Sequence, residues 1–253
     1  MAIMDQDEFW AIVDRAREGI EDTRTAEGAK QVAEKVGQRL AELGREAAVA
    51  FDLRYAVLDA ESYDWNLWGA AYLMRGGCSD DAFDYFRGWL VTQGRSIWER
   101  ALRDPDTLAE LGIDPDDDFL LCESMLSVGR AAFDEDADFF DAVDAARAEL
   151  PADTFNGPLL GDDFDHEDDD AVHARYPRLA EIYLQSEDVP GLPASVPNAQ
   201  SCQRAHRCTL MAASLARWAT RRSSRCVAVA RCLRCSLVPK SGCGVLSLDQ
   251  LVP

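Results

Sequence analysis

The amino-acid sequence predicts an all-α fold on two observations. Apolar side chains recur at intervals of three and four residues in one segment after another, the spacing that places them on one face of a helix. No segment alternates apolar and polar residues with the β-branched enrichment typical of strands. The helical pattern covers residues 5–185, where we expect one domain of about eight helices, followed by a disordered tail over residues 186–253.

The first three helices follow from the amino-terminal pattern. Residues 8–20 carry apolar side chains at helical spacing, and Asp5 precedes them, where an acid favours a helix N-terminus. Thr25 is the expected N-cap of a second helix, which ends where Gly44 suits the C-terminal position. A third helix over residues 45–60 has a broad apolar surface, which predicts a central place in the fold.

Glycine and serine separate the next three helices. A fourth helix spans residues 63–75 and ends at Gly76-Gly77, because glycine adopts a positive φ at little cost. Ser79 is then the N-cap of a fifth helix that reaches Gly94. A further helical segment follows directly over residues 95–102.

Proline marks the later helices. Asp104-Pro105 is typical of an N-cap followed by the first residue of a short helix, here expected to run through Leu111. Asp114-Pro115 opens another helical segment in the same way. Residues 171–185 form one last helix or two short ones, since Pro177 breaks the pattern near their middle.

Five motifs of unusual composition lie within these elements. They are Asp7-Glu8-Phe9-Trp10, the aromatic-rich run from Leu67 to Leu90, Gln93-Gly94-Arg95, Asp104-Pro105-Asp106 and Tyr176-Pro177-Arg178-Leu179. Taken together they resemble the DUF4240 family, a bacterial domain family with no established activity. The resemblance covers about residues 5–185 and implies a domain identity without implying a reaction.

Charge divides the chain sharply. The net charge is −20, yet residues 191–253 contain nine Lys and Arg against a single acid, so the remainder carries −28. Such an acidic body repels polyphosphate, which argues against direct nucleic-acid binding and favours a basic partner, a cation or simple solubility. The first residues have neither the basic nor the apolar region of a signal peptide, and no apolar run approaches about 18 residues, so we expect a cytoplasmic protein without a membrane segment.

The carboxy-terminal tail differs from the body in composition. Residues 191–253 hold six of the eight cysteines and eight arginines without amphipathic periodicity. The first interpretation is translation of a shifted reading frame; the second is a disordered basic extension that folds back on the acidic body. The third is a zinc site built on Cys232-Leu233-Arg234-Cys235, for which the second tight cysteine pair of a structural site is missing.

The sharpest candidate for chemistry is Asp80-Asp81 with Arg87 and Arg95. Adjacent carboxylates at a helix start can bind a cation, or one of them can act as a base, and a guanidinium two turns further along can meet a substrate anion. The alternative is structural, because Ser-Asp-Asp is also typical of a stable helix N-terminus and Arg87 can pair with a neighbouring acid. Both interpretations stay open from the sequence.

Aromatic side chains are the second set of candidates. Trp68, Tyr72, Tyr85 and Trp89 belong to a larger group that lines either an aromatic cleft or the core of the fold. Tyr85 and Trp89 are four residues apart and therefore share one helix face. Spacing alone does not separate the two possibilities.

Other patterns offer little chemistry. Residues 139–150 are expected to be helical, and residues 151–170, rich in Pro, Gly and Asp, to form an irregular acidic loop. The runs that begin at Asp114 and Asp134 start like calcium-binding loops but lack the required glycine and glutamate. No nucleophile elbow, phosphate-binding loop or dinucleotide fingerprint occurs, so no cofactor is expected. The two acids beside Cys78 raise the pKa of its thiol if their charges dominate, whereas the helix N-terminus opposes that shift.

Three functions follow as hypotheses. The leading one is a non-catalytic cytosolic module that binds a protein or small ligand, with Trp68, Tyr72, Asp80, Asp81, Tyr85, Arg87, Trp89 and Arg95 as candidate residues. The alternative is a metal-dependent hydrolase that uses Asp80 and Asp81 with Arg87. The third is an acidic mimic of nucleic acid that occupies the groove of a basic partner.

Overall fold

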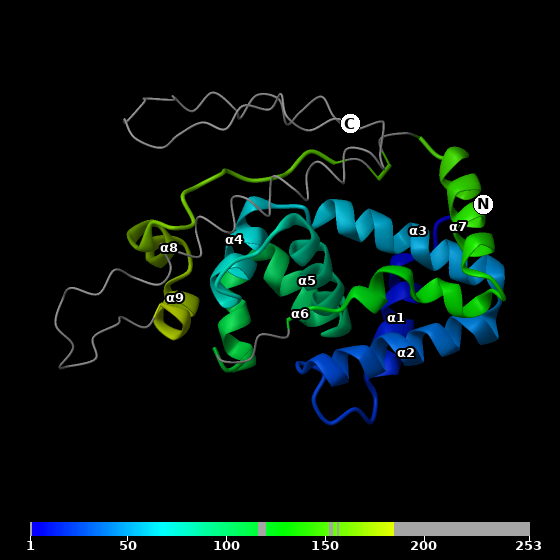
Figure 1. Ribbon diagram of the computed structural model, residues 1–253, viewed down its shortest axis with the longest axis horizontal. Coiled ribbons are helices and arrows are strands. Elements are labelled where there is room, and N and C mark those ends of the chain that lie inside the picture. Colours follow the sequence, from blue (N-terminus) through cyan, green and yellow to red (C-terminus); the bar gives the residue numbers. More distant parts are fainter. Residues whose placement is uncertain (1, 116–119, 152–153, 156, 185–253) are drawn as a thin grey trace, which may run out of the picture. The chain divides into compact units, whose positions relative to one another are not determined.

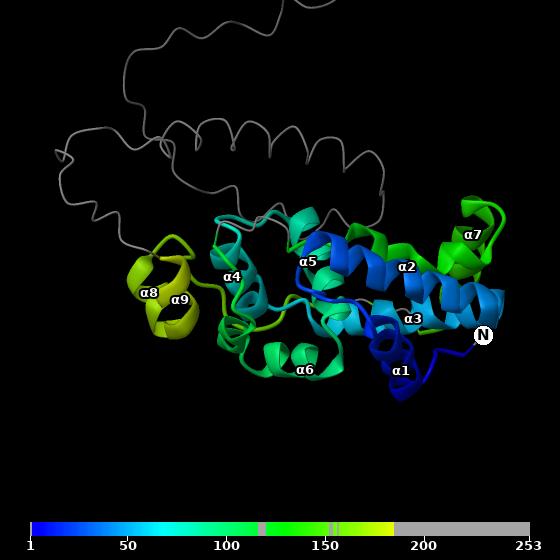
Figure 2. The ribbon, with the colours of Figure 1, turned by 90° about the horizontal axis from the view of Figure 1, so that it is seen from below.

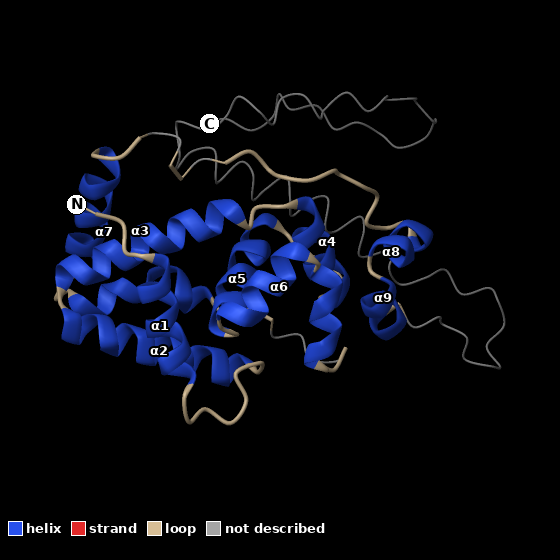
Figure 3. Ribbon diagram, turned by 180° about the vertical axis from the view of Figure 1, so that it is seen from behind, coloured by secondary structure: helices blue, strands red, loops and turns tan. Residues whose placement is uncertain are grey.

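A computed structural model describes residues 2–115, 120–151, 154–155 and 157–184. In these ranges the regular elements are helices, joined by loops and one isolated bridge between Asp64 and Leu160 (Figure 3). The expected all-α class is confirmed. The elements are α1 (Gln6–Arg17), α2 (Ala26–Leu43), α3 (Arg45–Glu61), α4 (Trp65–Met74), α5 (Asp80–Thr92), α6 (Arg95–Arg103), η1 (Pro105–Leu111), η2 (Glu123–Ala132), α7 (Asp136–Ala148), α8 (Asp169–Arg175) and α9 (Pro177–Tyr183).

The described ranges thus hold eleven helices rather than about eight. Two of them, η1 and η2, are 3₁₀ helices, a short and tight form that an apolar repeat of 3.6 residues does not predict. The last predicted helix is divided into α8 and α9 at Pro177, as expected for a residue that favours the first helical position. The segment expected to open at Asp114-Pro115 is not helical at those two residues, and η2 begins only at Glu123.

Helix starts agree closely with the expected caps. The side chains of Asp5, Thr25, Ser79 and Asp104 each accept a hydrogen bond from a backbone N–H in the first turn of the helix that follows. Such a bond satisfies one of the donors that a helix end leaves free and contributes about 0.5–2 kcal/mol. Gly76 has a φ of 59°, which allows α4 to stop there as predicted.

The core lies where α2, α3 and α5 pack around η2, with α1 against α2, α3 and α5. Figures 1 and 2 show η2 running beside α2 and α3, with α7 at one end of this helical unit and α8 and α9 at the other. The main cluster of buried apolar side chains extends from Phe9 and Trp10 in α1 to Tyr176 and Leu179 at the last helices. Position 88 inside α5 requires glycine, because a Cβ there would lie 2.5 Å from the carbonyl oxygen of Cys122.

Two of the motifs noted in the sequence contact each other in space. The buried carboxylate of Asp106, in η1, accepts hydrogen bonds from the backbone N–H groups of Arg178 and Leu179 at 2.9–3.2 Å and from Nε of Arg178 at 2.9 Å. It therefore caps the start of α9 from a distance of about seventy residues in sequence, a role like that of a local N-cap. This contact fastens α9 to η1.

Some predictions fall outside the described residues. They are the disordered tail, the zinc site on Cys232 and Cys235, and residues 116–119 of the calcium-like run that begins at Asp114. Within the ranges described, no helix is both long enough and apolar enough to cross a membrane.

Candidate binding site

The start of α5 presents two carboxylates to solvent. Ser79 caps the helix by accepting a hydrogen bond from the N–H of Ala82 at 3.3 Å, and Asp80 and Asp81 follow as exposed residues of the first turn. Both acids are well placed to interact with the partial positive charge of the helix N-terminus. Ser79, Asp80 and Asp81 therefore form a stable helix N-terminus, as the structural interpretation of the sequence predicted.

Arg87 is buried, with 3% of its side chain exposed. Its guanidinium donates to the backbone oxygen of Asp59 at 2.7 Å, lies 3.2 Å from the Asp59 carboxylate and forms a short ion pair with Asp84. The same group stacks over the rings of Phe83 and Tyr63, at 4.8 and 5.3 Å from their centroids. Arg87 thus joins α5 to the end of α3. Its guanidinium pairs with neighbouring acids, as the structural interpretation predicted, and does not face solvent where a substrate anion could reach it.

The carboxylates around Arg87 outnumber it. Burial raises the pKa of Asp59 to about 6 although Arg87 lies beside it. The pKa of Asp80 is also raised, first by partial burial and then by repulsion from Asp84 and Asp81. Two acids, Asp59 and Asp84, therefore pair with one guanidinium, and a third, Asp80, lies near enough for the charges of Asp84 and Arg87 to act on it.

A row of aromatic rings lies directly beside these acids. Trp65 stacks on Trp68 with ring centroids 5.5 Å apart, and Trp68 stacks on the buried Phe83 at 4.9 Å. Tyr63 packs against both Trp68 and Phe83, and its pKa is raised by burial and then by the nearby Asp80, Asp84 and Asp59. The acidic–aromatic patch, as we use the term, comprises Asp59, Tyr63, Trp65, Trp68, Asp80 and Asp84, all partly or fully exposed.

The acidic loop borders this patch. Leu160 exchanges backbone hydrogen bonds of 2.9 Å with Tyr63 and Trp65, which fixes the loop against the start of α4. His166 then lies between Trp65 and Tyr72, at 5.7 and 5.5 Å between ring centroids, and contacts Phe164 edge-on. Tyr72 therefore faces the loop.

The remaining candidates lie elsewhere. Trp89 is fully buried and donates its indole N–H to the backbone oxygen of Arg24 at 2.9 Å, so it belongs to the core. Tyr85 is partly exposed, and its pKa is raised by burial and by Glu123. Arg95 forms surface ion pairs with Asp7 at 2.6 Å and Glu99 at 2.7 Å, and hydrogen bonds to both raise its pKa.

Sequence reasoning missed three members of the patch. Asp59 and Tyr63 belong to the end of α3 and the loop after it, and no local signal connects them with Arg87. Asp84 did carry a signal, because it stands four residues after Asp80 and three before Arg87, spacings that place all three side chains on one side of a helix. Trp68 and Asp80 are the two named candidates that lie in the patch, and Trp65 belongs to the larger aromatic group noted in the sequence.

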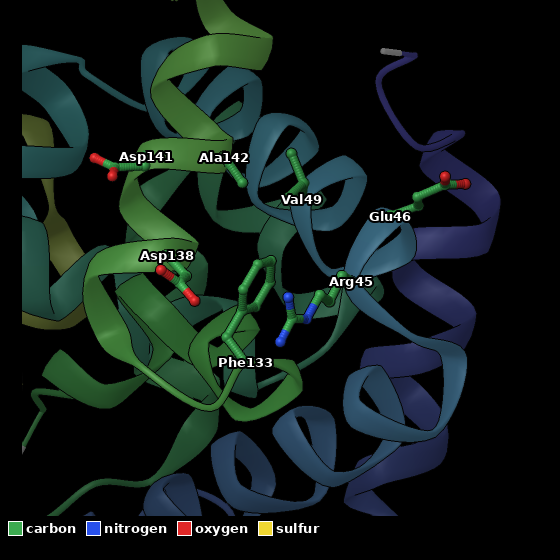
Figure 4. Close-up of a pocket in the computed structure, with 7 residues that line it drawn as sticks. All are labelled: Arg45, Glu46, Val49, Phe133, Asp138, Asp141 and Ala142. Atoms are coloured by element: carbon green, nitrogen blue, oxygen red, sulfur yellow. The ribbon is translucent and has the colours of Figure 1, made fainter.

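Two cavities occur away from these residues. One has a volume of about 350 Å³ and lies between α3 and α7, where Arg45 stacks over Phe133 at 5.0 Å and pairs with Asp134 at 2.7 Å (Figure 4). The second, about 410 Å³, lies between α1 and α2. Neither includes a candidate residue named from the sequence.

Metal and thiol chemistry can be stated for the described part of the chain. There, no group of three or more His, Cys, Asp and Glu side chains is arranged to hold a metal ion. Cys78 and Cys122 are buried free thiols. Burial, more than the neighbouring acids, raises the pKa of Cys78 to about 11, so the shift has the direction that the acids favour.

Comparison with known families settles the relationship of the chain. Residues 4–135 match the family described as "Protein of unknown function (DUF4240)". This chain belongs to the DUF4240 family. The matched region holds α1 to η2 and the whole acidic–aromatic patch, whereas the Tyr176-Pro177-Arg178-Leu179 motif lies beyond it. No curated protein and no solved structure matches the chain.

Proposed function

We propose that this DUF4240 protein is a non-catalytic cytosolic module that binds a basic segment of another protein at the acidic–aromatic patch. The observation that carries the proposal is the excess of acid at Arg87, where two carboxylates pair with one buried guanidinium and a third, Asp80, lies nearby, beside partly exposed rings. A Lys or Arg side chain of a partner would supply the missing positive charge. The same side chain would lie over an aromatic face.

The physical basis is the combination of two weak attractions. A cation over the face of Trp or Tyr gains about 0.5–2 kcal/mol, and more as water is excluded. A carboxylate whose pKa is raised by burial gains from each nearby positive charge, because that charge compensates the hydration it has lost. Trp65 and Trp68 offer the first attraction, and Asp59 and Asp80 the second.

The charge of the whole domain supports a protein partner. Residues 1–190 carry −28, which would steer a basic surface toward the molecule and raise its association rate. The hydrolase alternative requires Arg87 to contact a substrate, and its guanidinium already has two acids, a backbone oxygen and two rings as partners. A nucleic-acid mimic would use acidic charge alone and would leave the rings without a role.

The test is a titration of the full-length chain with a fluorescent Lys- and Arg-rich peptide and a Glu-rich peptide of equal length. We expect binding of the basic peptide only. Trp65→Ala, which removes one ring of the row, should weaken binding about tenfold, the equivalent of one cation–π contact.

Matched carboxylate variants supply the control. Asp80→Asn/Asp81→Asn should weaken the basic peptide about tenfold or more, whereas Asp169→Asn/Asp170→Asn should change it little. Both pairs are exposed acids in the first turn of a helix, and Asp80 of the first pair is a member of the patch whereas neither acid of the second pair is. Equal losses from the two pairs would show that net charge, and not the patch, attracts the peptide, and the proposal would then be abandoned.

A further inference from the structure

A second surface lies on the groove between α1 and α2, apart from the acidic–aromatic patch. Each helix contributes residues at intervals of three and four over two turns, and the open groove between them has a volume of about 410 Å³. Ile12 and Ala16 form its floor, and Leu43 stands at its edge with 39% of its surface exposed. Grooves of this form accept a helix whose apolar side chains follow the same spacing.

The rim of this groove is basic although the chain is acidic. Arg15, Lys35 and Arg39 line it, against two acids, Glu8 and Glu42. Lys35 is held across the groove by donating to the backbone oxygen of Glu18 at 2.7 Å, and Arg39 pairs with Glu42 at 2.8 Å. An occupant with an apolar stripe flanked by carboxylates would complement this surface.

Helix α7 of the same protein presents an exposed aromatic ring flanked by carboxylates. Phe140 is 48% exposed, the largest value among the large apolar side chains of the described residues. Ala137, Asp141 and Asp144 lie exposed around it, while Phe139, Val143 and Ala146 hold the opposite face in a small core with Val49 and Leu53. The exposed face of α7 is thus apolar at its centre and acidic at its edges.

We propose that α7 of one copy of this protein docks in the α1/α2 groove of a second copy. Phe140 would bury its ring against Leu43 and Ile12, and Asp141 and Asp144 would lie among the cations of the rim. The two surfaces are different, so each copy offers one of each, and association is head-to-tail. The net charge of −20 opposes association, which is therefore measured at physiological ionic strength, where charges are screened beyond about 8 Å.

The test uses sedimentation velocity of the full-length chain under reducing conditions over a range of concentrations. Three single variants place an acid at the large apolar side chains that are exposed among the described residues: Phe140→Asp on the helix, Leu43→Asp in the groove, and Leu160→Asp as the matched control outside both surfaces. Arg15→Glu is a second groove variant, which reverses an exposed charge on the rim. Circular dichroism and a melting curve establish that each variant is folded.

We expect the wild type and Leu160→Asp to associate, and Phe140→Asp and Leu43→Asp each to weaken self-association about tenfold or more. A mixture of Phe140→Asp and Leu43→Asp should recover a one-to-one complex, because each variant keeps the surface that the other has lost. The proposal would be overturned if the wild type is monomeric or if Phe140→Asp associates as the wild type does. It would also be overturned if Leu160→Asp loses association equally, or if the mixture stays monomeric.

Discussion

Replacement of Arg87 by methionine tests whether its buried guanidinium is structural. The side chain is 3% exposed and connects α5 to the end of α3 through the backbone oxygen and the carboxylate of Asp59. Methionine keeps most of the apolar stem in place, so the substitution mainly removes the charge and its hydrogen bonds.

The expected loss can be worked out from the contacts. A hydrogen bond made by a charged group contributes about 1.5–3 kcal/mol, and breaking a buried ion pair costs about 3–5 kcal/mol. The two acids are 36% and 49% exposed, so water compensates part of that loss, and we expect about 3 kcal/mol. For a domain of this size the melting temperature should fall by about 6–12 °C.

The assay is thermal unfolding followed by circular dichroism, with Arg95→Met as the matched control. Arg95 also forms two ion pairs, but at the surface, where such pairs contribute little. If Arg87→Met melts at the same temperature as Arg95→Met, the guanidinium does not hold the two helices together. Arg87 would then again be a candidate for ligand binding.

Three further predictions concern the core and the last helix. Burial raises the pKa of Asp52 to about 6, so its contribution to stability is present at low pH and is lost as the pH rises through 6. Relative to Asp52→Asn, the wild type should therefore lose about 1–3 kcal/mol of unfolding free energy between about pH 4 and pH 7, as measured by urea titration. A difference between the two proteins that stays constant over this pH range would contradict the prediction. Gly88→Ala should destabilise the fold by about 1–3 kcal/mol, since the added Cβ meets the carbonyl oxygen of Cys122, and an unchanged melting temperature would refute that steric argument. Asp106→Ala should speed amide hydrogen exchange in α9 about tenfold or more while α2 stays protected. Equal exchange of α9 in the wild type and in Asp106→Ala would show that Asp106 does not anchor α9.

The sequence by itself determined where several of the helices begin and end. A cap such as Ser79 bonds to an N–H three residues away, and Gly76 stops α4 through its own φ, so both effects act within one turn. The 3₁₀ helices were harder to predict, because their repeat of three residues per turn differs from the 3.6-residue period by which α-helices are recognised. Pattern reasoning therefore identified the fold class and most of the helices but counted too few.

The tertiary structure alone decided which candidate residues face solvent. Trp68 and Trp89 are both aromatic residues at helical spacing, yet one lies in a partly exposed row and the other in the core. Arg87 had an acid within reach on its own helix, but its second partner, Asp59, stands 28 residues earlier and meets it only where α3 and α5 pack together. Local spacing fixes the direction of a side chain about its own helix axis, whereas burial and long-range pairing depend on which helix packs against that side.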